Sequence, residues 1–237
     1  SIDTMRAGFD PTEYDIVHAQ DCISANAVGT CIRTIHHLDQ FTTPILVECH
    51  EKAVVNPYAR ICVSQAVADE VHAGWGRSPA VIPNGVDFDR FADAASATPE
   101  ATTERETWRG QLGRYVLAVG GIEPRKGSID LLEAFATLRR EDPDLQLVFA
   151  GGETLFDYRD YRADFDSRRE ELGITPVVLG AVDDDALPAL VAGCEVFAFP
   201  SIKEGFGLAA MEALAAGRPV VARELPILRE VFGDAVR

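Results

Sequence analysis

The second half of the chain alternates short apolar runs with longer amphipathic stretches. The apolar runs have the length of strands and cover residues 115–119, 145–150, 177–179, 196–199 and 220–222. The amphipathic stretches predict helices that begin near Ser128, Tyr161, Ala186 and Leu208. Strand and helix therefore alternate, which is typical of a doubly wound parallel sheet.

The first third of the chain shows the same rhythm. Its apolar runs cover residues 14–17, 32–35, 61–63 and 80–82 and predict a second parallel sheet. Residues 89–111 are rich in Ala, Thr, Glu and Pro and have only modest helical character. We therefore expect an α/β fold with three parts: a partial N-terminal Rossmann-like domain (1–85), an interdomain connector (86–113) and a C-terminal Rossmann-like domain (114–237).

Composition narrows the classes of function. The 237 residues include 22 Lys and Arg against 38 Asp and Glu, which gives a formal net charge of −16. A chain so acidic, without a basic stripe, is a poor partner for nucleic acid, so RNA and DNA are excluded as main partners. The five cysteines form no C-x-x-C pair, which favours a reducing, cytoplasmic location and indicates no zinc site. No apolar run reaches the about 18 residues of a membrane span.

The first candidate site follows the run at 115–119. The segment Gly120 to Gly127 reads GGIEPRKG and opens a helix. Glycines such as Gly121 let a ligand approach the backbone, the helix start offers N–H groups to an anion, and Arg125 and Lys126 add positive charge. In parallel sheets ligands bind at this end of the strands. The segment predicts a phosphate clamp, and an ordinary turn with solvated basic residues is the equally open alternative.

A second segment, residues 201–217, carries two carboxylates. Glu204 precedes a helix, and Glu212 lies eight positions later inside it. Carboxylates accept hydrogen bonds from hydroxyl groups, and small neighbours leave room for a ligand beside Glu212. The N–H groups that can stabilise developing negative charge at the helix start belong to Gly205, Phe206 and Gly207. The residues expected to face the sheet are Leu208, Met211, Leu214 and Ala215.

Together these motifs resemble a known family. The set has three members: the stretch from Glu204 to Ala222, which contains Glu-x7-Glu, the sequence Pro-Asn-Gly-Val-Asp at 83–87, and the sequence Glu-Pro-Arg-Lys-Gly at 123–127. This set is similar to the retaining glycosyltransferases of the GT-B fold, family 4, from Asp15 to the end of the chain. The resemblance implies two Rossmann-like domains facing a cleft, with the N-terminal domain incomplete and the closing C-terminal helices missing. It also implies transfer of a sugar from a nucleotide-diphosphate sugar to an acceptor hydroxyl, with no metal and no other cofactor.

The resemblance assigns roles to single positions. Glu204 matches the residue that contacts the donor sugar, and Glu212 matches the one that bonds the ribose hydroxyls. Lys126 matches the lysine of the donor diphosphate, and His36, in Thr-Ile-His, matches an active-site histidine. Asn84 matches the hinge between the domains.

One position departs from the family pattern. An arginine usually follows the first glycine, Gly120, of the phosphate loop, and Gly121 stands there in this chain. We hypothesise that Arg125 supplies the missing charge from the same loop. The catalytic candidates are therefore His36, Glu204 and Lys126, and the donor-binding candidates are Asn84, Gly120, Gly121, Arg125, Lys126, Gly205, Phe206, Gly207 and Glu212.

Several alternatives stay open. The run Asp183 to Asp185 contains the Asp-x-Asp of metal-dependent transferases, but it precedes a helix and is expected to cap it, so no metal is assigned. A sugar-nucleotide epimerase, a phosphorylase or a non-catalytic nucleotide-binding module would share the architecture. The base is expected to contact residues 151–154 and 178–182, and neither the base nor the acceptor is identified. Peripheral membrane contact through a preceding part of the protein is a further expectation.

Overall fold

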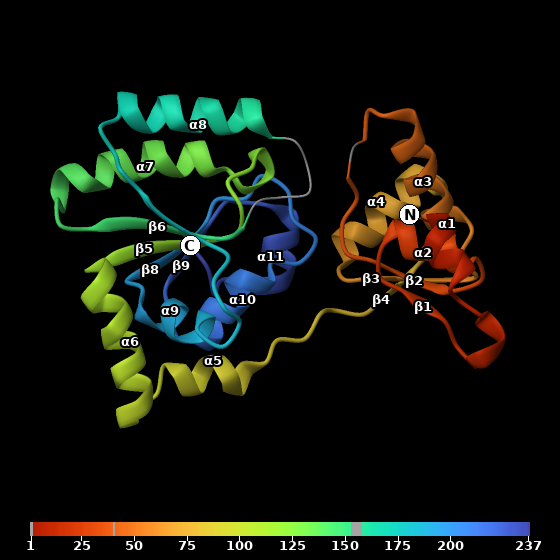
Figure 1. Cartoon of the computed structure of the whole chain (residues 1–237), viewed down its shortest axis with the longest axis horizontal. Helices are drawn as coiled ribbons and strands as arrows, with labels where there is room; N and C mark the ends of the chain where they lie inside the picture. The colour runs from red at the N-terminus through yellow and green to blue at the C-terminus, as the bar shows by residue number, and fades with distance from the viewer. Residues whose placement is uncertain (1, 40, 153–157) are drawn as a thin grey trace. The chain divides into compact units, whose positions relative to one another are not determined.

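The computed structural model describes residues 2–39, 41–152 and 158–237. It divides into two compact units, one made of Ser1–Asn84 with Glu204–Phe206 and the other of Gly85–Lys203 with Gly207–Arg237 (Figure 1). The unit boundary lies between Asn84 and Gly85, at the position where the family resemblance places the hinge. Glu153 and Thr154, in the segment expected to contact the base, lie outside the described residues.

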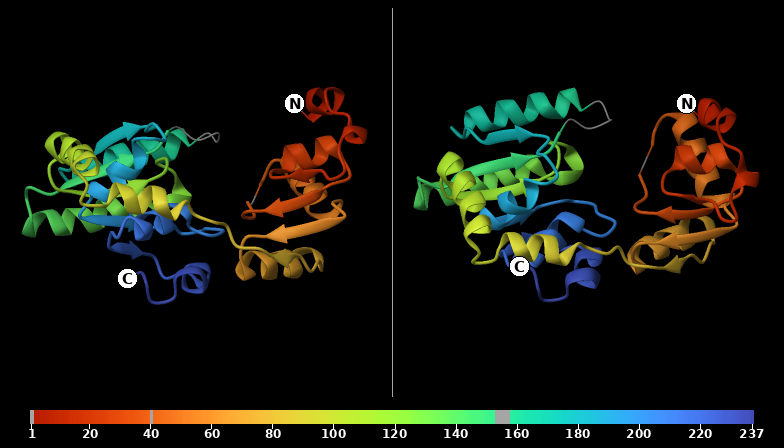
Figure 2. Two further views of the ribbon diagram at one scale, coloured as in Figure 1. Left: turned by 90° about the horizontal axis from the view of Figure 1, so that it is seen from below. Right: turned by 60° about the horizontal axis from the view of Figure 1, so that its bottom comes forward.

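The N-terminal unit is built on a parallel sheet of four strands in the order β1-β2-β3-β4. The strands are β1 (His18–Ala19), β2 (Ile32–Ile35), β3 (Ala59–Cys62) and β4 (Ala80–Val81). The helices are α1 (Ile2–Ala7), η1 (Pro11–Glu13), α2 (Cys22–Val28), α3 (Pro44–Val55) and α4 (Gln65–Trp75), shown with the strands in Figure 2. Because each crossover moves one strand along the sheet in the same direction, right-handed connections place α2, α3 and α4 side by side on one face.

The C-terminal unit has a parallel sheet of five strands in the order β7-β6-β5-β8-β9. Its strands are β5 (Tyr115–Val119), β6 (Gln146–Ala150), β7 (Val177–Gly180), β8 (Val196–Phe199) and β9 (Val220–Ala222). Its remaining elements are η2 (Pro124–Lys126), α7 (Ser128–Glu141), α8 (Arg159–Glu171), α9 (Leu187–Gly193), α10 (Leu208–Ala215) and α11 (Pro226–Phe232). Figure 1 shows α7 and α8 along one face of this sheet and α9 and α10 on the other.

The strand order places a topological switch point between β5 and β8. From β5 the chain proceeds outward through β6 to β7, and then returns to β8 on the opposite side of β5. The loops that follow β5 and β8 therefore leave the sheet toward opposite faces. Such a divergence creates the crevice in which doubly wound folds bind their ligands.

The expected connector forms two helices of the C-terminal unit. These are α5 (Phe88–Ala94), which packs against α9 and α10, and α6 (Pro99–Leu112), which packs against α9. Phe91 and Leu112 are buried and anchor them. Residues 88–112 are therefore part of a packed layer, because a few apolar side chains suffice to hold a short helix on a core.

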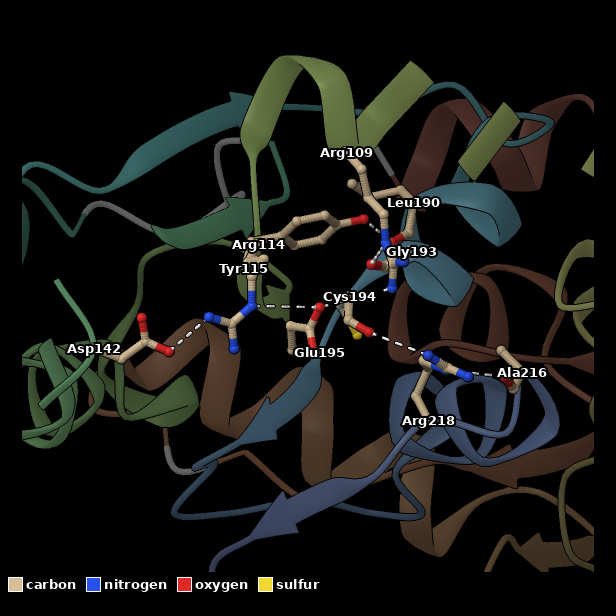
Figure 3. A network of polar contacts seen from close by, with 10 residues as sticks. All are labelled: Arg109, Arg114, Tyr115, Asp142, Leu190, Gly193, Cys194, Glu195, Ala216 and Arg218. Atoms are coloured by element: carbon tan, nitrogen blue, oxygen red, sulfur yellow. Dashed lines mark hydrogen bonds and ion pairs between the residues drawn. The ribbon is translucent and has the colours of Figure 1, made fainter. Parts of the chain in front are cut away.

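A polar network holds the amino end of the same sheet (Figure 3). The Tyr115 hydroxyl, fully buried, donates a 2.6 Å hydrogen bond to the carbonyl of Leu190 in α9. The guanidinium of Arg109 donates to the carbonyl of Gly193 at 3.0 Å and lies 3.8 Å from the Glu195 carboxylate. The network ties α6, α9 and the start of β5 together, at the end of the sheet opposite to the candidate site.

Candidate functional site

The phosphate-clamp loop packs directly on the end of β8. Gly127 has a φ of +64°, and a Cβ built there would lie 2.4 Å from the carbonyl oxygen of Pro200. The backbone N–H of Ile202 donates a 2.8 Å hydrogen bond to the carbonyl of Arg125. The two loops at the switch point are thus joined backbone to backbone, which requires a residue without a side chain at position 127.

The β6 loop also approaches this point. A Cβ on Gly151 would lie 2.2 Å from the carbonyl carbon of Gly120 and 2.7 Å from the nitrogen of Gly121. The backbone N–H of Gly120 donates to the carbonyl of Ala150 at 2.8 Å. The glycines that were expected to let a ligand approach the backbone therefore also let a neighbouring backbone segment of this protein approach.

Lys126 stands at the switch point itself. Its side chain lies over Gly120, since a Cβ there would be 3.3 Å from the lysine Cε. Its ammonium Nζ lies 5.4 Å from the centre of the Phe199 ring, at the end of β8. A cation over an aromatic face is attracted by the ring quadrupole, and this attraction holds the ammonium group over the ring. Lys126 thus places a positive charge between β5 and β8, at the crevice in which doubly wound folds bind their ligands.

Arg125 is engaged by a carboxylate of its own loop. Its guanidinium lies 3.0 Å from Glu123 Oε1, and Glu123 is buried. A buried carboxylate needs a partner of opposite charge, and Arg125 provides one. Our hypothesis that Arg125 replaces the charge lost at Gly121 therefore requires its guanidinium to serve Glu123 and the ligand together.

Glu212 lies on α10 in a partly buried position. Burial raises the pKa of its carboxyl above the ordinary value, and the opposing attraction of Arg90 is weaker than this effect. The Arg90 guanidinium also donates to the backbone carbonyl of Asp184 and lies 3.4 Å from its carboxylate. Arg90 was not among the expected site residues and no local motif marks it, whereas Asp184 belongs to the acidic run that was expected to cap a helix.

The face that α10 buries differs from the expected one. The buried residues of the helix are Ala210 and Ala213, and Ala216 follows them. Leu208 is 42% exposed. Because α10 packs against α5, α9 and two strands at once, small side chains line its inner face. The expected orientation toward the sheet is therefore wrong for Leu208, whereas Met211, Leu214 and Ala215 are half-buried.

The acidic run before α9 does not cap that helix through its side chains. The N-cap of α9 is Ala186, and it makes no side-chain capping hydrogen bond. The backbone carbonyl of Asp183 accepts from the N–H groups of Ala186 and Leu187. Asp184 pairs with Arg90 instead, so the expected capping role is wrong for that residue. Among the described residues, no group of His, Cys, Asp and Glu is arranged to hold a metal ion.

The histidines of the N-terminal unit form a hydrogen-bonded chain. His36 Nε2 lies 2.9 Å from Gln20 Oε1, Gln20 Nε2 lies 3.2 Å from His18 Nε2, and that atom is 2.6 Å from Thr34 Oγ1. Burial lowers the pKa of His36, and the neighbouring charge of Arg33 adds to this effect. His36 is therefore neutral at neutral pH. Gln20 was missed by sequence reasoning because a lone glutamine in a loop carries no signal.

The expected site residues are distributed over both units. Gly120, Gly121, Arg125, Lys126 and Glu212 belong to the C-terminal unit, with Gly207 as the N-cap of α10. His36 and Asn84 belong to the N-terminal unit, and so does the segment Glu204–Phe206. The phosphate-clamp loop and the β8 loop are brought together within the C-terminal unit. The described part of the chain holds no helix that is long and apolar enough to span a bilayer.

Comparisons with known proteins agree with this architecture. The chain matches the family described as glycosyl transferases group 1 over residues 104–237 and glycosyltransferase family 4 over residues 2–90. It is 34% identical over 195 residues to the phosphatidyl-myo-inositol mannosyltransferase of Mycobacterium tuberculosis, a match that covers 80% of this chain and 46% of that protein. It is 36% identical over 164 residues to the D-inositol 3-phosphate glycosyltransferase of Salinispora arenicola, covering 66% of this chain and 36% of that protein.

Solved structures show the same fold. HepE of Anabaena, crystallised with UDP and glucose, aligns with a TM-score of 0.77 at 24% identity, covering 97% of this chain and 64% of that one. The chain spans about half the length of the mannosyltransferase relative. The expected α/β fold of the GT-B type, with two parallel sheets, is confirmed. Only the C-terminal sheet is doubly wound, because the crossover helices α2, α3 and α4 of the N-terminal sheet lie on one face. With one family match covering more than half of its residues, the chain belongs to the glycosyl transferases group 1, within glycosyltransferase family 4.

Proposed function

We propose that this chain provides the donor site of a glycosyltransferase that moves a sugar from a nucleotide-diphosphate sugar to an acceptor hydroxyl with retention of configuration. The observation that carries the proposal is Lys126, whose ammonium is held over Phe199 at the switch point between β5 and β8. Breaking the sugar–phosphate bond leaves extra negative charge on the departing diphosphate. A fixed cation in a preorganised loop stabilises that charge in the transition state.

The other expected residues take their roles from the family. Glu212 accepts hydrogen bonds from the ribose hydroxyls, Glu204 contacts the donor sugar, and neutral His36 takes the role of the family's active-site histidine. The acceptor hydroxyl attacks on the side of the leaving group, and the departing phosphate oxygen takes its proton. No side-chain base and no metal are needed in this scheme, and the reaction takes place in the cytoplasm. Turnover that persists at full rate in excess chelator is the expected result for metal independence.

A thermal-shift panel tests the donor site. The chain is heated with UDP, GDP, ADP and their sugar conjugates, because a ligand at 100 times its dissociation constant adds about 2.7 kcal/mol of stability. We expect one base to shift the wild type and the shift to shrink strongly in Lys126→Ala and Glu212→Ala. Lys52→Ala is the matched control, since Lys52 pairs with Glu48 on an exposed helix face. Equal shifts in all four proteins would remove Lys126 and Glu212 from the site.

A non-catalytic nucleotide-binding module is the second candidate. It is favoured by Gly121, which stands where the family has a second cation, and by the pairing of Arg125 with Glu123. It predicts a thermal shift with a nucleotide but no release of nucleoside diphosphate from the sugar conjugate. Release that requires inorganic phosphate would instead identify a phosphorylase.

A further inference from the structure

Ser201 lies at the switch point without a role in the scheme above. It follows β8 by two residues, and only 1% of its surface is exposed. Its Oγ atom is buried and has no hydrogen-bond partner in the part of the chain that the structure describes. A buried hydroxyl without a partner loses its hydrogen bonds to water and gains nothing in return, so it requires an explanation. Alanine would fill nearly the same space without this loss.

The surroundings of Ser201 point to a ligand. Ser201 lines a hollow of about 10 Å³ together with Lys126, Gly120, Gly121 and Phe199. This volume is about that of one water-sized oxygen atom. The wall therefore combines a cation, glycine backbone and an unused hydroxyl with apolar side chains such as Leu131 and Phe149, around space for a single oxygen. These are the groups that a phosphate oxygen requires.

The position of Ser201 is fixed by its neighbours on both sides. The carbonyl of Pro200 accepts a 3.0 Å hydrogen bond from Arg223 Nε and lies against Gly127. The N–H of Ile202 donates to the carbonyl of Arg125 at 2.8 Å. The hydroxyl is thus held on rigid backbone within the same hollow as Lys126, so little ordering would be needed to bind a ligand.

From this geometry we propose that the Ser201 hydroxyl donates a hydrogen bond to a phosphate oxygen of the bound nucleoside diphosphate, beside Lys126. This inference rests on the proposed donor site and adds to it a residue that partly replaces the donor missing at Gly121. The hydroxyl gains its partner only when the ligand is present. Ser201 therefore favours binding and contributes nothing to folding.

Ser201→Ala tests the inference through two measurements. Titration calorimetry is carried out with the diphosphate that stabilises the wild type, chosen among UDP, GDP and ADP, and with the matching nucleoside. We expect the diphosphate to bind about tenfold more weakly to the variant, as for a lost hydrogen bond to a charged group, and the nucleoside to bind equally to both proteins. Without ligand, urea unfolding should show Ser201→Ala to be at least as stable as the wild type.

The controls separate the inference from the proposed function. Ser167→Ala, on the exposed side of α8, should leave both affinities unchanged. If the wild type binds a diphosphate and Ser201→Ala binds it equally well, the hollow holds structural water only and the inference is overturned. A ligand-free variant that is clearly less stable than the wild type would also overturn it, since the hydroxyl would then have an internal partner. If the wild type binds none of the three diphosphates, the proposed function and the inference both fail.

Discussion

Gly127→Ala should destabilise the C-terminal unit by two separable effects. The residue has a φ of +64°, a left-handed conformation that alanine adopts at a cost of about 1 kcal/mol. Its new Cβ would also lie 2.4 Å from the Pro200 carbonyl oxygen, which is backbone and must move. Overpacking of this kind costs about 1–3 kcal/mol. We therefore expect Gly127→Ala to lower the free energy of unfolding by about 2–4 kcal/mol and to displace Lys126.

Gly173→Ala is the matched control for this substitution. Its φ is +65°, and nothing lies within 4 Å of the Cβ that would be added, so it measures the left-handed conformation alone. Both glycines belong to the C-terminal unit, whose unfolding Trp108 reports by fluorescence when Trp75 is replaced by phenylalanine. Urea unfolding should show a loss of about 1 kcal/mol for Gly173→Ala and at least twice that for Gly127→Ala. Equal losses would refute the close packing of the two loops.

Three further predictions concern single side chains. Arg125→Ala should weaken nucleotide binding less than Lys126→Ala in calorimetry, because Arg125 is held 3.0 Å from a buried carboxylate; equal losses would count against that pairing. Glu212→Gln should raise the free energy of unfolding near neutral pH, because the raised pKa of Glu212 means that its contribution to folding is lost as pH rises. This gain should vanish as pH falls to the ordinary carboxyl range, and a pH-independent difference in urea unfolding would contradict the reasoning. Tyr115→Phe should lower the free energy of unfolding by about 1–3 kcal/mol, because the Leu190 carbonyl loses its 2.6 Å partner; an unchanged urea midpoint would show that this bond is not needed.

Central strands were predictable from the sequence because both of their faces are buried. The apolar runs at 115–119 and 196–199 coincide with β5 and β8 residue for residue. A strand covered on both faces is a continuous apolar segment and needs no other signal. At the edge of the other sheet the prediction was wrong: an apolar run at 14–17 precedes the strand, which forms only at His18–Ala19. There pairing with a single neighbour sets the strand, and that contact cannot be read from one segment.

Helix faces were harder to predict, because periodicity does not say how closely a helix packs. On α10, Leu208 was expected to point inward but is exposed, whereas Ala210 and Ala213 are the buried residues of the helix. Four elements surround that helix, and only small residues let it approach all of them. Similarly, α6 contains few apolar residues and α5 is only seven residues long, yet Phe91 of α5 is fully buried. One well-placed aromatic side chain outweighs a weakly helical composition.

In the candidate site, too, some residues could be recognised from their own segment of sequence and others could not. The loop that carries Lys126 was recognisable because its glycines are demanded by backbone geometry, and Gly127 and Gly151 each lie where a Cβ would overlap neighbouring backbone. Ser201 and Arg90 carry no such local demand. Their importance comes from the residues that face them. Ser201 shares a hollow with Lys126, and Arg90 faces Asp184 and Glu212. A backbone constraint can therefore be recognised in a single segment of sequence, because it requires glycine at a given position. A lone hydroxyl or guanidinium acquires its function only from residues that folding brings to it.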